Sequence, residues 1–202
     1  MGLALTSQLS AINTMLSVIG EAPVNSIDSS SVTTDVAMAK SVLDETSREV
    51  QSAGWHFNRE IDVVLSPDSS NNIILPTNVG KVDVEAVNAG DKEYIQRGTK
   101  LYNKTDKTFT ITSTKKCTIV YMLNWVDLPE SARNYIMIRA ARKFQDRVVG
   151  SEKHRQFTMT DEAGALFAMR AAESDNADYS IFDNYDVYRV IDRGNVRNRV
   201  TT

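Results

Sequence analysis

Residues 50–58 read Val50-Gln51-Ser52-Ala53-Gly54-Trp55-His56-Phe57-Asn58, and the hydrophobic period of the chain changes across them. Before this stretch, apolar residues recur every three or four positions, as they do on one face of a helix. After it, short runs rich in β-branched residues predict strands. Gly54 stands where a helix would end. The sequence therefore predicts helices on the N-terminal side and a β region on the C-terminal side.

Two helices are predicted before this change of period. The first covers about residues 6–19, is capped by Thr6 or Ser7 and ends at Gly20. The second begins at Thr34 and ends at Gly54, after a Ser-rich loop. Their apolar faces are Leu9, Ile12, Leu16 and Ile19 in the first helix and Val36, Ala39, Leu43 and Val50 in the second. Two antiparallel helices joined by a loop are the simplest arrangement.

Short strand-like runs follow, separated mostly by Asn, Gly, Asp, Pro or Ser. The runs are residues 61–65, 73–75, 82–87, 94–95, 100–102, 108–112 and 117–122. Gaps this short leave no room for crossover helices, so the strands are expected to pair mainly antiparallel.

Helical signals return at residues 127–130, Asp-Leu-Pro-Glu, where Asp127 is expected to cap a third helix. We expect this helix to end at Gly150, and a fourth to run from a cap at Ser151 to about Glu173.

The predicted fold class is α+β: a four-helix bundle with a small antiparallel β-domain (sandwich or barrel) inserted between helix 2 and helix 3, plus an extended C-terminal arm. The expected units are the first helical pair at 1–54, the β-domain at 55–125, the second helical pair at 126–179 and the arm at 180–202.

Composition narrows the class of protein. The chain has 202 residues, a formal net charge of −3 and 42% hydrophobic residues, as in ordinary globular proteins. These values argue against a disordered, collagen-like or disulfide-stapled chain. No apolar run is long enough to span a bilayer, and we expect no signal peptide at residues 1–10. The slightly acidic balance argues against a main role in gripping nucleic acid by charge.

Residues that carry chemistry are few. With two histidines, His56 and His154, far apart in the chain and a single cysteine, Cys117, a zinc site is not expected. Cys117 lies in a strand-like run and is interpreted as a small buried residue. Phosphate-loop and dinucleotide fingerprints are absent from the sequence. We therefore expect no catalytic residue, no metal and no cofactor.

Carboxylates leave one enzymatic alternative open. A glycosidase needs a pair of them, and Glu49, Glu60, Asp62 and Glu130 are the candidates. Their spacing singles out no pair, and solvated charges on helix faces and strand edges explain each of them equally well.

Two basic regions are candidate interaction sites. The third predicted helix carries Arg133, Arg139, Arg142, Lys143 and Arg147, and the C-terminal end carries Arg189, Arg193, Arg197 and Arg199. Such residues suit phosphate, an acidic partner or a subunit interface, but an ordinary solvated face or a frayed terminus is also consistent with them. The protein-interface residues predicted from them are Arg139, Arg142, Arg147, Arg189, Arg193, Arg197 and Arg199.

Three blocks of sequence resemble the tail tubular protein A family of short-tailed phages. The first is residues 9–24, which include Gly20-Glu21-Ala22-Pro23. The second is residues 35–58, which end in Gly54-Trp55-His56-Phe57-Asn58, and the third is Leu128-Pro129-Glu130 followed by residues 142–150. The blocks occur in the family's order and lie in the predicted helices, whereas the β region and the arm match only in layout.

This resemblance implies a structural virion protein and no enzyme. It implies a homo-dodecamer ring that serves as adaptor and gatekeeper between the portal protein and the tail nozzle protein of the tail tubular protein B type. A tail fibre is a further candidate partner. Double-stranded DNA would pass through the ring without sequence-specific binding, and twelve copies would present about −36 charges to it. The implied location is the virion tail, assembled in the host cytoplasm and without a membrane contact.

Two other functions remain as alternatives. One is a tail-associated polysaccharide hydrolase that uses a carboxylate pair. The other is a nucleic-acid-binding module that rests on the basic third helix, whose retention of DNA would depend on salt.

Overall fold

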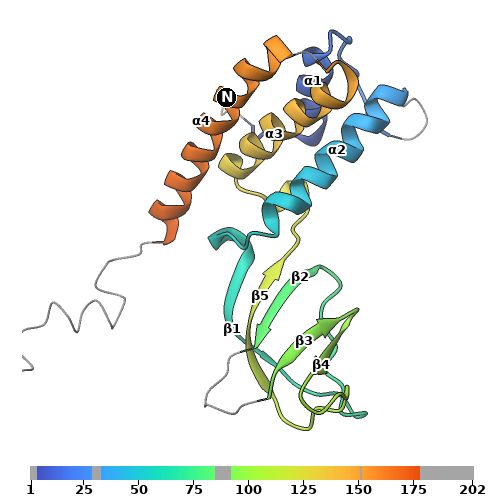
Figure 1. The fold of residues 1–202 in the computed structure, drawn as a ribbon, viewed down its shortest axis with the longest axis vertical. Helices are drawn as coiled ribbons and strands as arrows, with labels where there is room; N and C mark the ends of the chain where they lie inside the picture. Colours follow the sequence, from blue (N-terminus) through green and yellow to red (C-terminus); the bar gives the residue numbers. More distant parts are fainter. Residues whose placement is uncertain (1–3, 29–32, 85–91, 151, 178–202) are drawn as a thin grey trace, which may run out of the picture.

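The computed structural model describes residues 4–28, 33–84, 92–150 and 152–177 and shows an α+β protein (Figure 1). The described helices are α1 (Gln8–Val18), α2 (Thr34–Gln51), α3 (Glu130–Val148) and α4 (Glu152–Ala177), with short 3-10 helices η1 (His56–Asn58) and η2 (Trp125–Asp127). The strands are β1 (Arg59–Leu65), β2 (Val79–Val84), β3 (Tyr94–Arg97), β4 (Lys100–Asn103) and β5 (Lys115–Tyr121). The helices gather at one end of the molecule and the strands at the other. The arm predicted for residues 180–202 lies outside the described residues.

The helix ends follow from local sequence. The Ser7 hydroxyl caps α1 by accepting a hydrogen bond from the Ser10 backbone N–H at 3.0 Å, which confirms one of the two predicted caps. Gly20 takes a left-handed φ of +84° after α1, as expected of a residue that ends a helix. Thr33 caps α2, one residue before the predicted start, through its hydroxyl and the Val36 N–H.

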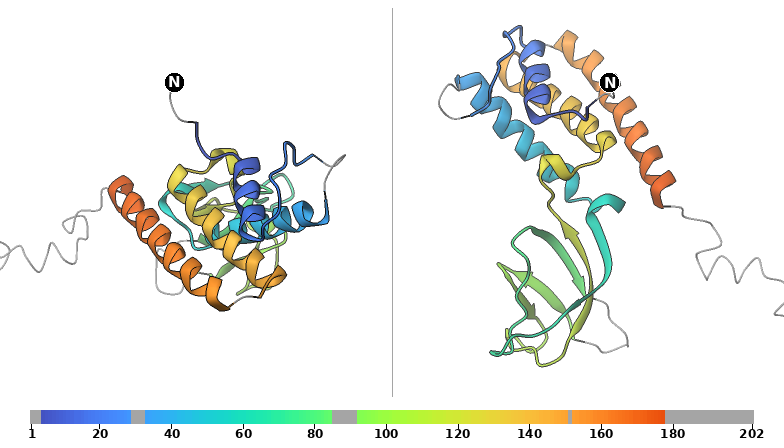
Figure 2. Two further views of the ribbon diagram at one scale, coloured as in Figure 1. Left: turned by 90° about the horizontal axis from the view of Figure 1, so that it is seen from above. Right: turned by 180° about the vertical axis from the view of Figure 1, so that it is seen from behind.

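The helices share one hydrophobic core around α3, which contacts α1, α2 and α4. Its largest fully buried side chains include Ile12, Met15, Leu16, Leu43, Ile136, Phe144 and Met169. Burying one such side chain is worth about 1.5–3 kcal/mol before the cost of ordering it. In two views α2 and α4 lie on opposite sides of α3 (Figures 1 and 2). The helical region therefore has a separate outer flank on each side of α3.

The β region contains a pair of small antiparallel sheets, as the short gaps predicted. The first has the strand order β1-β5-β2, and the second is the β3-β4 hairpin. The β1 register shifts between Glu60 and Val63, and Asp62 takes a left-handed φ of +65° there. Leu65, Val82 and Val84 pack against the hydrophobic clusters of both sheets, so the sheets are held together by shared apolar contacts.

Two of the predicted strands are wrong. Residues 73–75 and 108–112 form no described strand and make only the isolated bridges Ile74–Lys100 and Asn103–Thr108. Ile73 and Leu75 are nevertheless almost fully buried. Their apolar pattern therefore indicates burial and not a strand that is paired along its length. The predicted continuation of β2 over residues 85–87 lies outside the described residues.

The predicted cap of α3 is also wrong. Asp127 lies in η2, and α3 begins at Glu130 after Pro129, without a side-chain cap. The Glu130 carboxylate instead accepts hydrogen bonds from Thr6, from its backbone N–H at 2.9 Å and from its hydroxyl. A carboxylate in the first turn also favours the positive end of the helix dipole. Glu130 therefore anchors the N-terminal segment to the start of α3.

The junction between the helical and β regions explains the Gly-Trp-His-Phe-Asn stretch. Gly54 has a φ of +76°, and a Cβ there would stand 2.9 Å from Val120 Cγ2, so glycine is required for both reasons. Trp55 and Phe57 pack, partly buried, against the helical core. Buried Asn58 donates from Nδ2 to the carbonyls of Gln51 (2.9 Å) and Tyr121 (2.8 Å).

Candidate interaction surfaces

The two histidines and the cysteine lie in three different elements, η1, α4 and β5. Cys117 is buried, and its Sγ donates to the Val63 carbonyl at 3.3 Å. His56 is exposed, and its backbone N–H donates to a Glu173 carboxylate oxygen at 2.5 Å. His154 lies in α4, with its side chain outside the described residues. Within the described ranges no three His, Cys, Asp or Glu residues group as metal ligands, and no helix is both long and apolar enough to cross a membrane.

Each of the four candidate carboxylates has a structural partner of its own. The pairs are Glu49 with Arg139 and Lys143, Glu60 with Tyr121, Asp62 with Lys116 (2.6 Å), and Glu130 with Thr6. Burial, and then the charge of Glu60, raises the pKa of Tyr121. The candidates are spread over α2, β1 and α3, and a structural explanation is available for each.

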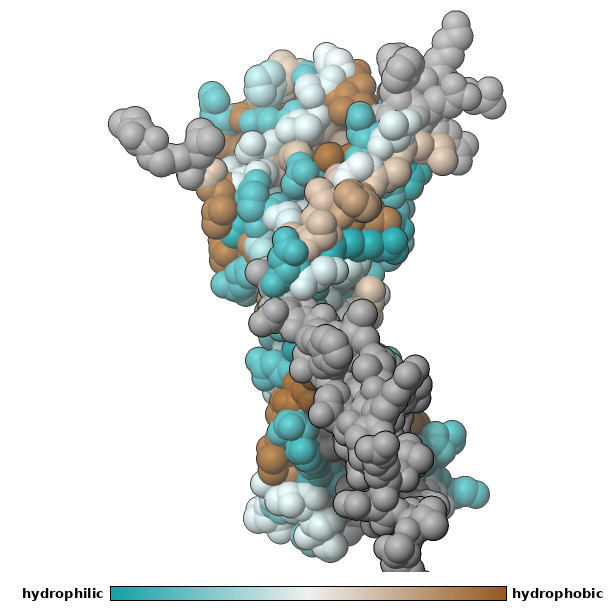
Figure 3. Space-filling view, turned by 90° about the vertical axis from the view of Figure 1, so that its left-hand side faces the viewer, coloured by the Kyte–Doolittle hydropathy of each residue, from teal (hydrophilic) through white to brown (hydrophobic). Residues whose placement is uncertain are grey.

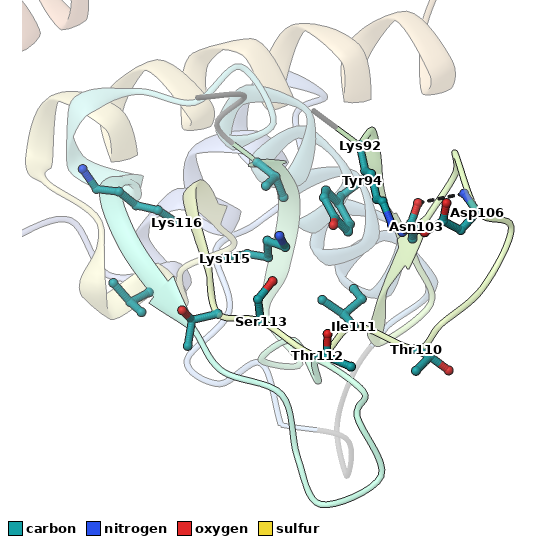
Figure 4. Close-up of a pocket in the computed structure, with 13 residues that line it drawn as sticks. Lys92, Tyr94, Asn103, Asp106, Thr110, Ile111, Thr112, Ser113, Lys115 and Lys116 are labelled. Atoms are coloured by element: carbon teal, nitrogen blue, oxygen red, sulfur yellow. Dashed lines mark hydrogen bonds and ion pairs between the residues drawn. The ribbon is translucent and has the colours of Figure 1, made fainter. Parts of the chain in front are cut away.

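The β region carries an open cleft of about 630 Å³ (Figure 4). It is lined by hydroxyl, amide and lysine side chains, by the aliphatic residues Val64, Val84 and Ile111, and by Tyr94. The Tyr94 ring centroid lies 4.7 Å from Lys115 Nζ. Among the described lining residues Asp106 is the one carboxylate, and it forms an ion pair with Lys92 at 2.5 Å. A hydrogen bond from Lys92 lowers the pKa of Asp106. The described lining thus lacks the second carboxylate that glycoside hydrolysis needs.

Three bases predicted as interface residues lie together on α3 and pair with acidic residues of the same chain. Arg139 binds Glu49 of α2, Arg142 binds Glu162 of α4, and Arg147 binds both oxygens of Glu45 of α2 at 2.8 and 3.0 Å. Lys143 joins the set through Glu49. These cross-helix pairs connect α3 to both of its flanking helices. The predicted interface residues Arg189, Arg193, Arg197 and Arg199 lie outside the described residues.

The pairing changes the acid–base properties of the helices. A hydrogen bond from Lys143 lowers the pKa of Glu49, and one from Arg147 lowers the pKa of Glu45. A hydrogen bond to Glu162 raises the pKa of Arg142. The positive charge of α3 is therefore balanced inside the chain, which leaves less of it to attract phosphate.

Arg133 has a different role from the other bases of α3. Its guanidinium is buried, with the residue only 5% exposed, and it donates to the backbone carbonyls of Leu128 (2.9 Å), Thr6 (3.1 Å) and Val126 (2.7 Å). It thus joins the N-terminal segment and η2 to α3. The sequence contains a signal of this: Arg133 lies three and seven residues before buried Ile136 and Ala140, on the apolar face of the helix.

The outer side of α4 is mostly uncharged although it faces solvent (Figure 3). Its exposed residues from 159 to 174 are Met159, Thr160, Ala163, Gly164, Phe167, Ala168, Ala171 and Ser174, with Asp161 and Arg170 as the charged members. Phe167 is 76% exposed and Met159 is 55% exposed. Solvated helix faces are normally rich in charge, so this face has the composition of a contact surface. We call it the α4 outer face.

An apolar groove of about 490 Å³ borders the α4 outer face. It runs between α1, α3 and α4 and is lined in part by Val18, Ile138, Ala141, Gly164 and Ala168. The absence of a side chain at Gly164 leaves open space there, since a Cβ would meet no atom within 4 Å. The groove extends the apolar surface from α4 across to α1.

A second weakly charged stretch lies on α2, across α3 from α4. The exposed residues at the N-terminal half of α2 are Thr34, Ala37, Met38 and Ser41. They recur at helical spacing and therefore share one side of the helix. The helical region thus offers a contact candidate on each of its flanks.

The comparisons with known proteins agree with a structural reading. The family model described as Tail tubular protein matches residues 9–179, which include α1 from its second residue, α2, the β region, α3 and α4. The comparison with curated proteins gave no match.

Proposed function

The chain belongs to the tail tubular protein family, and on that premise we propose that it is the adaptor subunit of a short-tailed phage. Membership of the family makes it a structural component of the phage tail. In our proposal twelve copies form a closed ring in the virion, assembled in the host cytoplasm. The portal protein and the tail nozzle protein bind on its two sides, and DNA is ejected through its channel.

The observation that carries this proposal is the α4 outer face. Phe167 and Met159 are large apolar side chains on a face that is otherwise made mostly of small residues and that no described segment of the chain covers. Leaving them in water has a cost of the order of 1 kcal/mol each relative to burial. A neighbouring copy that packs on α4 would remove both from water.

Ring closure requires two different contact faces on each subunit. In a ring of twelve these faces point roughly 150° apart, so they lie on nearly opposite sides of the subunit. The α4 outer face and the exposed stretch of α2 belong to helices on opposite sides of α3, which supports such an arrangement. We propose that the α4 outer face of one copy packs against the α2 side of the next.

The regions of the chain have separate tasks in this proposal. The four helices act as one bundle that closes the ring, and the β region, inserted between α2 and α3, extends from it. Arg189, Arg193, Arg197 and Arg199 anchor the C-terminal arm on a neighbour or on the portal. Of the three predicted interface residues on α3, Arg147 has the most exposed side chain, at 47%, and is the most accessible to an acidic neighbour.

Imaging and mass measurement test the proposal. Purified chain, alone and mixed with its portal protein, is examined by native mass spectrometry and negative-stain microscopy. We expect a closed ring of twelve copies, formed by the chain itself or on the portal. A species that stays monomeric even with the portal would contradict the adaptor role.

A further inference from the structure

The outer edge of β1 is open in the described structure. In the sheet order β1-β5-β2, strand β1 is terminal and pairs with β5 alone. Its backbone is regular again after the bulge at Asp62, where Val63, Val64 and Leu65 pair with Cys117, Lys116 and Lys115. An edge of this kind presents unpaired N–H and C=O groups that can bind a further strand.

Two apolar side chains of β1 face solvent. Ile61 is 56% exposed and Val64 is 64% exposed. Proteins usually protect edge strands with charges, proline or a covering segment, because an exposed apolar edge promotes aggregation. On β1 the bulge at Asp62 and the exposed charges of Arg59, Glu60 and Asp62 act in this way, and all of them lie before Val63. The edge from Val63 to Leu65 is therefore a site at which we expect another segment to pair.

The end of α4 lies beside η1, at the start of β1. Glu173 accepts a hydrogen bond from the backbone of His56 in η1, which directly precedes β1. The described chain ends four residues later, at Ala177. The eight steps from Ala177 to Tyr185 reach at most about 29 Å, which is sufficient to arrive at any point along a strand of about 23 Å such as β1.

The remaining sequence contains one segment suited to a strand. Residues 185–191 read Tyr-Asp-Val-Tyr-Arg-Val-Ile, in which five of seven residues are aromatic or β-branched and none is Gly or Pro. Asp183-Asn184 precedes the segment and Gly194 follows it closely, as expected of turns. Its apolar residues fall on both faces of a strand, so either face can place a side chain beside Val64.

We infer that residues 185–191 add as a strand to the outer edge of β1 of the same chain. Their backbone groups pair with Val63–Leu65, and their side chains cover Val64. The pairing is intrachain because Glu173 holds the end of α4 beside β1, which gives the segment a high effective concentration there. Arg193, Arg197 and Arg199 follow the strand and stay available for the subunit contact proposed above.

Hydrogen exchange on the full-length chain tests this inference. The chain is compared with V187P/V190P, in which proline removes two strand N–H donors, and with S180P as a control in the preceding connection. Exchange is measured by mass spectrometry at a concentration at which the chain is monomeric. We expect the amides of 63–65 and the remaining amides of 185–191 to exchange at least tenfold faster in V187P/V190P than in wild type. S180P should match wild type.

Three results would overturn the inference. The first is exchange of residues 185–191 in wild type at the rate of an unstructured peptide. The second is protection of 63–65 that the double proline variant does not change. The third is protection that disappears on dilution, which would assign the strand to a neighbouring copy. Ring formation is measured separately on the same variants at higher concentration and with the portal protein, so loss of the ring with intact protection bears on the adaptor role alone.

Discussion

The side chain of Gln51 pairs with the backbone of Leu123 as a neighbouring strand would. Its Nε2 donates to the Leu123 carbonyl at 3.1 Å, and its Oε1 accepts from the Leu123 N–H at 2.7 Å. Gln51 is the last residue of α2, and Leu123 follows β5, so this contact joins the two chain segments that cross between the helical and β regions. The residue is 2% exposed, which makes both hydrogen bonds expensive to lose.

Replacing Gln51 with Leu should therefore destabilise the protein by about 2–3 kcal/mol, because the backbone groups of Leu123 are left without partners. Urea denaturation measures the change. Gln96→Met is the control, since the Gln96 amide makes only long contacts of 3.4 and 3.3 Å with carbonyls. It should cost less than about 1 kcal/mol. Equal effects of the two changes would remove the special role of Gln51.

Arg133→Met should cost about 3 kcal/mol or more, because three backbone carbonyls lose a charged donor inside the protein. Arg147→Met serves as the matched change on the same helix. Its ion pair with Glu45 is solvent-exposed, so the loss should stay within about 1 kcal/mol. Thermal unfolding of both variants checks the difference, and an Arg133 variant as stable as the Arg147 variant would refute it.

Acid should weaken the attachment of α2 to α3. The pKa values of Glu45 and Glu49 are lower in the folded chain than their ordinary value of 4.5, because Arg147 and Lys143 donate hydrogen bonds to them. Folding thus favours the ionised carboxylates, and this contribution is present above the unfolded pKa and is lost as the pH falls through the folded pKa.

Glu49→Gln should therefore flatten the dependence of unfolding free energy on pH between about 5 and 3. Lys143→Gln should flatten it as well, since it removes the partner that lowers the pKa of Glu49. Urea titrations at a series of pH values measure the slope. A slope unchanged by Glu49→Gln would show that this carboxylate does not contribute to acid sensitivity.

Phe167→Asp should prevent ring formation while leaving the monomer folded, because it places a charge on the α4 outer face. Ile74→Asp, at a side chain 49% exposed in the β region, is the control and should still assemble. Size-exclusion chromatography with light scattering measures the mass of the assembly, and circular dichroism shows whether the variant is folded. Rings that form normally in the Phe167→Asp variant would exclude this face from the subunit contact.

The sequence predicts best what depends on neighbours along the chain. Ser7 and Gly20 mark the ends of α1 because caps and left-handed residues act locally. The run at 73–75 predicts a strand wrongly because its burial does not reveal that only an isolated bridge forms beside β4. The run at 108–112 has strand-like composition, but most of it is exposed and only Ile111 is buried.

The candidate site shows the same limit. The bases of α3 are visible in the sequence, but their acids lie about ninety to a hundred residues away on α2, or on α4, and only the packing of the helices pairs them. Arg133 carries a usable signal in its position on the apolar face. The α4 outer face around Phe167 has no such signal in the sequence, because the spacing of the apolar residues of α4 does not show which side of the helix packs inward.

The β region leaves and rejoins the helices through β1 and β5, which are neighbours in one sheet. Its entry and exit therefore lie side by side. We expect a longer or shorter β region to be tolerated here without a change in the packing of the helices, provided that the junction residues are kept. A β domain grafted in its place would need two adjacent antiparallel strands at the junction where β1 leaves the helical region and β5 returns to it.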